Sequence, residues 1–81
     1  MKIYDFEGKK NICGARVLEA RRNRKLSQAE LAARLQTEGV NIERDSVSRI
    51  EIGTRFVADY ELLVLSKILG VSPAYLLGAE K

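Results

Sequence analysis

Four polar side chains in the middle of the chain have types and a spacing suited to hydrogen-bonding chemistry. Arg44, Asp45, Ser48 and Arg49 recur at intervals of three to four residues, which places them on one side of an α-helix. An arginine can hold the O6 and N7 atoms of guanine with two hydrogen bonds, and an aspartate can accept one from cytosine N4. Asp45 could instead pair with Arg44 and orient it. We favour this second role, because a carboxylate near phosphates is repelled unless it has a donor.

These side chains face outward only if their helix buries its opposite side. Val47, Ile50 and Glu51 supply that side, and Gly53 suits the left-handed position that ends a helix. Similar periodic apolar stripes predict four further helices. The five predicted helices run from the cap Asn11 to about Lys25, from the cap Ser27 to about Gln36, from Glu43 or Arg44 to Ile52, from Asp59 to Leu69, and from the cap Ser72 to Leu77.

The predicted fold class is therefore all-α, a compact five-helix bundle with a short N-terminal arm. The chain has 81 residues, of which 46% are hydrophobic and 31% charged, which suits one ordinary globular domain. Val40 and Ile42, in the loop between the second and third helices, are expected to tuck against the core. We divide the chain into an arm at 1–10, a domain at 11–78 and a tail at 79–81.

Composition excludes several kinds of chemistry. The chain has no histidine and a single cysteine, Cys13, which rules out a Cys/His zinc site, an internal disulfide and histidine-dependent nucleophilic catalysis. There is no glycine-rich phosphate loop, and the carboxylates are scattered. We expect no enzyme activity, no cofactor, no metal and no small-molecule ligand. No apolar run approaches the roughly 18 residues of a membrane span, so we expect a soluble, cytoplasmic protein without membrane contact.

The positive charge is concentrated at the start of the chain. The formal net charge is +3, but residues 1–25 alone carry eight basic and three acidic residues. Such a basic segment either attracts a polyanion or forms an ordinary solvated helix face. The residues for which both explanations stay open are Lys9, Lys10, Arg22, Arg24 and Lys25.

Two stretches together carry a family resemblance. Ser-Gln-Ala-Glu-Leu-Ala at 27–32, followed by Val-Ser-Arg-Ile-Glu-Ile-Gly at 47–53, resembles the phage-repressor and Cro-type helix-turn-helix domains, the XRE family. The resemblance continues through 59–62 and 69–72 to 75–77, so it covers residues 11–78. It implies a lambda-repressor-like, five-helix DNA-binding domain whose third helix reads base edges in the major groove.

The resemblance also implies roles for single residues. It makes Gln28 a phosphate contact that braces the third helix, and it makes Arg21 and Glu51 an ion pair between the first and third helices. The implied contacts to the groove floor are Arg44, Asp45, Ser48 and Arg49, and those to the DNA backbone are Thr54 and Arg55.

Three features depart from the compact family pattern. Six residues, 37–42, separate the two helices, where the usual turn has three or four. Gln36 stands where a glycine is common, and Glu43 stands near the cap of the third helix, where serine or threonine is usual. The docking angle and the register of the reading residues therefore stay open.

The sequence thus predicts a sequence-specific DNA-binding transcriptional regulator, a repressor that binds double-stranded operator DNA as a homodimer. Tyr75, Leu76 and Leu77 form either the dimer contact or an ordinary part of the core. The alternative is an antitoxin-like or adaptor helix-turn-helix module that binds another protein. Replacing Arg44 and Arg49 would separate the two, because an adaptor would keep its main interaction.

Overall fold

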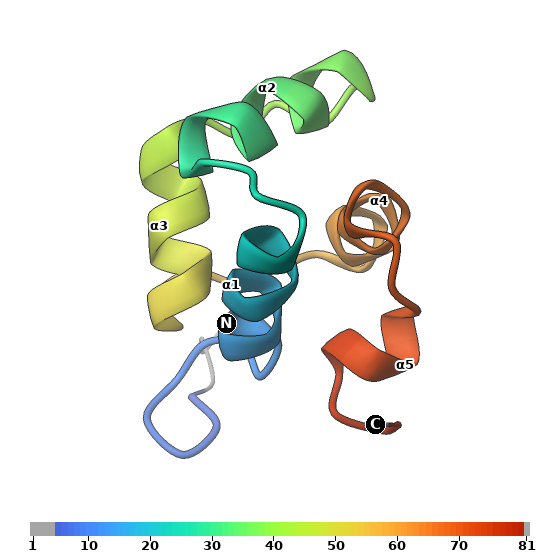
Figure 1. The fold of residues 1–81 in the computed structure, drawn as a ribbon. Coiled ribbons are helices and arrows are strands. Elements are labelled where there is room, and N and C mark those ends of the chain that lie inside the picture. The colour runs from blue at the N-terminus through green and yellow to red at the C-terminus, as the bar shows by residue number, and fades with distance from the viewer. Residues whose placement is uncertain (1–4, 81) are drawn as a thin grey trace.

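The structure is a computed structural model. Its described part contains five α-helices, with α1 near the centre of the molecule (Figure 1). This part comprises residues 5–80, so positions 1–4 of the predicted arm and position 81 of the predicted tail lie outside it. The all-α, five-helix prediction is confirmed. The helices are α1 (Gly14–Asn23), α2 (Gln28–Thr37), α3 (Arg44–Ile52), α4 (Asp59–Leu69) and α5 (Pro73–Leu76).

The ends of α2 and α3 follow the local sequence signals. The Ser27 hydroxyl accepts a hydrogen bond from the backbone N–H of Glu30 at 3.0 Å, and the Glu30 carboxylate accepts one from the N–H of Ser27 at 2.8 Å. These bonds lower the pKa of Glu30 below its ordinary value. Glu43 is the N-cap of α3, and Gly53 ends that helix with φ 96°. This fixes the register of the residues on the outward side of α3.

The prediction for the first helix was wrong at its start and correct at its end. The helix was expected to begin at the cap Asn11, but α1 begins at Gly14 with Cys13 as its N-cap. It was expected to end near Lys25, and α1 ends at Asn23 with Arg24 as its C-cap. Asn11 Oδ1 nevertheless accepts a hydrogen bond from the backbone N–H of Gly14, three residues later, at 2.8 Å, which is an ordinary spacing for a capping side chain. At the other end, Lys25 has φ 58°, a left-handed conformation that a helix cannot include. This turn directs the chain toward α2.

The core lies among the five helices, with α1 packed against α3, α4 and α5, and α2 packed against α3 and α4. The largest fully buried side chains come from α1–α5 and from the loop before α3: Val17, Leu31, Leu35, Ile42, Val47, Ile50, Leu65 and Leu76. The loop between α2 and α3 is thus anchored by Ile42, and Val40 is buried as well, as predicted. The Gln36 side-chain amide donates a hydrogen bond to the Ile42 carbonyl at 3.0 Å. Gln36 therefore holds the loop before α3 in place, a role that a glycine at this position could not have.

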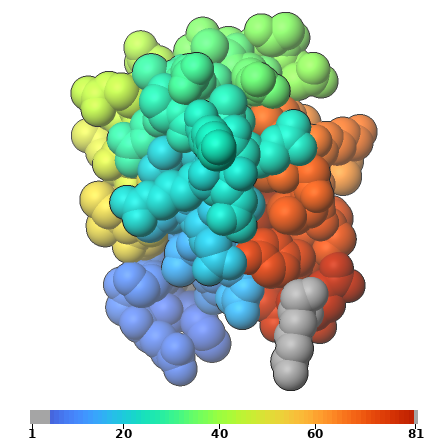
Figure 2. All heavy atoms as spheres, viewed as in Figure 1, coloured from blue at the N-terminus to red at the C-terminus, as the bar shows by residue number. Residues whose placement is uncertain are grey.

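The arrangement leaves α3 at one side of the molecule and α4 with α5 at the other (Figure 1). In the space-filling view, the N-terminal segment lies just below the C-terminal end of α3 (Figure 2). Across residues 5–80, no helix combines the length and the apolar character that crossing a bilayer requires.

Candidate nucleic-acid interface

The outward side of α3 carries the four polar residues that the sequence singled out. Val47 and Ile50 are buried on the inner side, whereas Arg44, Asp45 and Arg49 are exposed and Ser48 is half-buried. Arg44 Nη2 lies 3.1 Å from Asp45 Oδ1, so the two side chains pair while both stay largely in solvent. An exposed pair of this kind contributes about 1 kcal/mol or less. Arg44 could therefore exchange Asp45 for another acceptor at little cost.

Ile52 belongs to the same outward side, and the sequence analysis missed it. It follows Ser48 by four residues, and 59% of it is exposed. The spacing that grouped Asp45, Ser48 and Arg49 already contained this signal, but the residue was read only as the end of the helix. Its methyl groups add an apolar element on the side of Arg49, three residues earlier, of the kind that can pack against a thymine methyl.

The inner side of α3 is fixed to α1 and α2 through one carboxylate. Arg21 Nε donates to Glu51 Oε2 at 2.6 Å, and Arg21 Nη2 donates to Glu51 Oε1 at 3.1 Å. Gln28 Nε2 donates to the same Oε1 at 2.9 Å, and Arg21 Nη1 donates to the Leu26 carbonyl at 2.8 Å. The sequence-predicted residues Arg21, Glu51 and Gln28 are thus brought together, and they connect three helices.

The loop after α3 contains a second ion pair. Arg55 Nη1 and Nη2 donate to the two carboxylate oxygens of Glu61 at 3.0 and 3.2 Å, and Nη1 also donates to the Phe56 carbonyl at 2.8 Å. Burial raises the pKa of Glu61, but the hydrogen bonds from Arg55 and from the N–H of Ala58 outweigh it and bring the pKa below its ordinary value. Arg55 therefore has a structural partner that the sequence analysis did not identify. Thr54, the other predicted residue of this loop, is exposed.

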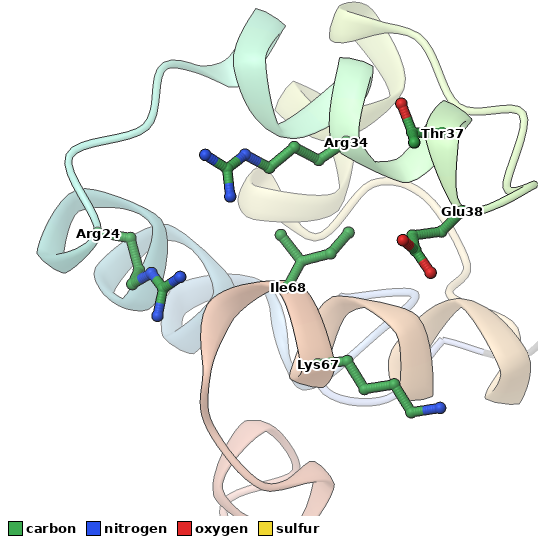
Figure 3. Close-up of a pocket in the computed structure, with 6 residues that line it drawn as sticks. All are labelled: Arg24, Arg34, Thr37, Glu38, Lys67 and Ile68. Carbon is green, nitrogen blue, oxygen red and sulfur yellow. The ribbon is translucent and has the colours of Figure 1, made fainter.

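The basic residues of the N-terminal third separate into different regions. Lys9 and Lys10 lie against the C-terminal end of α3, where Lys9 Nζ donates to the Ile52 carbonyl at 3.2 Å and Lys10 N–H donates to the Gly53 carbonyl at 2.8 Å. Arg24 instead faces a groove of about 430 Å³ that contains no residue of α3 (Figure 3). The residues that line this groove are Arg24, Arg34, Thr37, Glu38, Lys67 and Ile68.

The comparisons with known proteins agree with this geometry. A family model described as helix-turn-helix matches residues 17–76. The chain belongs to this helix-turn-helix family. The chain is also similar to the P22 c2 repressor, solved as a crystal structure in complex with synthetic operator 9T in the presence of Tl+. The two are 28% identical with a TM-score of 0.73, over 86% of this chain and 98% of that one.

The resemblance that the sequence indicated is thereby confirmed. A comparison with curated proteins found no match. The matched range includes α2, α3 and the six residues between them, 38–43, which form a loop anchored by the buried side chain of Ile42.

Proposed function

We propose that this helix-turn-helix protein is a sequence-specific DNA-binding repressor that reads the major groove of double-stranded operator DNA with α3. The observation that carries the proposal is the contrast between the two sides of α3. Its inner side is fixed by Glu51 and two buried aliphatic residues, while its outer side presents Arg44 and Arg49 to solvent. The major groove is about 12 Å wide and admits one such helix. The similar P22 c2 repressor was solved in complex with a synthetic operator, which supports operator DNA as the partner.

In this proposal each of the predicted site residues has a distinct role. Arg49 and Arg44 donate to base edges, with Asp45 orienting Arg44, and Ser48 lies between them on the groove side. Arginine is suited to this task because its planar fork matches the O6 and N7 acceptors of guanine. The proposed contacts to the DNA backbone are Gln28, Thr54 and Arg55. Backbone contacts hold the domain in register but carry no sequence information directly.

We further propose that the protein binds as a homodimer, in the cytoplasm, on an operator with half-sites about 34 Å apart. Of the predicted contact residues, Leu76 is fully buried in the core, and the Tyr75 hydroxyl donates to Glu19 at 2.8 Å. Leu77 is 45% exposed and borders an apolar hollow of about 340 Å³ with Ile12. Of the three predicted residues we therefore keep Leu77 as the proposed dimer contact, and we add its neighbour Ile12. Leu77→Asp should abolish dimers in sedimentation experiments with operator DNA and leave the fold intact.

The direct test is selection of bound duplexes from a random DNA pool, followed by affinity measurements on the selected duplex and a scrambled one. Arg49→Ala should weaken binding to the selected duplex by about 1–3 kcal/mol and relax the preference at one base pair. The matched control is Arg34→Ala, because Arg34 lines the groove that lies away from α3. Failure to select any duplex, or an equal loss on both duplexes with Arg49→Ala, would contradict the proposal.

A further inference from the structure

Three consecutive residues near the N-terminus cap the C-terminal end of α3. Lys9 Nζ donates to the Ile52 carbonyl at 3.2 Å, Lys10 N–H to the Gly53 carbonyl at 2.8 Å, and Asn11 Nδ2 to the Ile50 carbonyl at 3.1 Å. The last four carbonyls of an α-helix have no partner within the helix. Here a segment 39 to 43 residues away supplies side-chain donors to two of them, those of Ile50 and Ile52. The Ile50 carbonyl also accepts from the N–H of Gly53 at 3.1 Å.

Asn11 is the centre of this contact. Besides its bond to Ile50, Nδ2 donates to the Arg55 carbonyl at 2.8 Å, while Oδ1 accepts from the N–H of Gly14 at 2.8 Å. One half-buried side chain thus joins the start of α1, the end of α3 and the loop after α3. Both amide protons are used, so Asn11 has no donor left with which to read DNA.

Gly14 makes the close approach possible. A Cβ at this position would lie 2.2 Å from the Ile50 carbonyl oxygen and 2.9 Å from that of Glu51. Any other residue would therefore push the first turn of α1 away from the end of α3. We call Lys9, Lys10, Asn11 and Gly14 the N-terminal clamp.

We propose that the N-terminal clamp positions the reading helix, so that Asn11 controls base discrimination without touching DNA. The inference rests on the proposed function. Ile52 follows Arg44 by eight positions, a length of about 12 Å along a helix. A tilt of about 10° around the clamped end would move Arg44 by about 2 Å, which exceeds the tolerance of a hydrogen bond between 2.7 and about 3.2 Å. Small rotations at the clamp thus decide whether the arginines reach their acceptors.

The alternative is that the clamp serves stability alone. In that case its loss would lower the melting temperature, but the folded protein would discriminate between duplexes as before. A positioning role predicts a change in discrimination at a temperature where the variant is fully folded. The ratio of affinities for the selected and the scrambled duplex measures this directly, and thermal unfolding identifies the temperature range.

The test compares Asn11→Ala with the matched control Asn23→Ala, because Asn23 is exposed at the end of α1. For Asn11→Ala we expect the affinity ratio to fall about tenfold, the size of one imperfectly read base pair. The salt dependence of binding to the scrambled duplex should not change, since no charge is lost. Asn23→Ala should leave both quantities as in the wild type. If folded Asn11→Ala has the same affinity ratio for the selected and the scrambled duplex as the wild type, the inference is overturned.

A second variant, Lys9→Met, keeps the test decisive if Asn11→Ala does not fold, because Lys9 is exposed. It removes the donor to Ile52 and should also lower the affinity ratio. If Lys9 serves as a phosphate contact instead, both duplexes lose affinity equally and the salt slope falls by about 0.9. That result would count against the clamp. If the wild type selects no duplex, the proposed function fails, whereas a selecting wild type with unaffected variants refutes the clamp alone.

Discussion

Replacing Glu51 by glutamine should be among the most destabilising single changes in the protein. Its side chain is only 4% exposed, and that of its partner Arg21 is 11% exposed. The substitution keeps the size of the side chain and removes its charge. The Arg21 guanidinium cannot lose its proton, so it would remain charged in the interior without a counterion. Gln28 would also lose the charged acceptor that it shares with Arg21.

The expected loss follows from the energetics of buried ion pairs. Removing one partner of such a pair costs about 3–5 kcal/mol. The lower end applies here, because the guanidinium keeps its bond to the Leu26 carbonyl and glutamine can still accept one hydrogen bond. A domain of this size is stable by about 4–12 kcal/mol, so a loss of about 3 kcal/mol removes a large share. At about 4–8 °C for each kcal/mol, the melting temperature should fall by about 12–24 °C.

Urea unfolding followed by circular dichroism measures this loss, with a constant m-value showing that the unfolding transition is comparable. The matched control is Glu38→Gln at an exposed site, which should change stability by about 0.5 kcal/mol or less. The double variant Arg21→Met, Glu51→Leu removes both charges and should recover most of the stability. A loss below about 1 kcal/mol for Glu51→Gln would refute the reasoning, since exposed pairs contribute that little.

Three further predictions have defined outcomes. Burial raises the pKa of Glu61, but the hydrogen bonds from Arg55 and Ala58 outweigh it, so the pKa in the folded protein lies below the ordinary value of 4.5. The stabilisation that these bonds give is present above that pH and is lost as the pH falls through the folded pKa. The stability of Glu61→Gln should therefore depend less on pH in this acid range than that of the wild type. Ser27→Ala removes the cap of α2 and should cost about 1 kcal/mol in urea unfolding. Burial raises the pKa of Cys13, so its thiol should react with a disulfide reagent far more slowly in native protein than in urea, and equal rates would contradict this.

The parts of the fold that were predictable depend on short-range signals. The capping box of Ser27 and Glu30 acts across three residues, and Gly53 ends α3 through its own conformation. Neither depends on the rest of the chain. The Arg21–Glu51 contact was accessible only because the resemblance implied it, since periodicity places both residues inward but does not pair them.

The residues that were missed act over longer distances or were given a different role. Asn11 was assigned to the cap of a helix, but its amide protons go to carbonyls 39 and 44 residues away, which no local pattern encodes. Arg55 was considered only with respect to DNA, yet Glu61, six residues later, holds it. That distance is too long for a pair within one helix. Only the fold brings the loop back over the start of α4.

The central claim, that α3 reads base edges in the major groove, can be tested most directly by methylation interference on the selected duplex. Methylation of guanine N7 blocks an acceptor in the major groove, and methylation of adenine N3 blocks one in the minor groove. Binding should be lost when particular guanines are methylated, and Arg49→Ala should become insensitive to one of them. Interference confined to adenines, or absent altogether, would contradict the account.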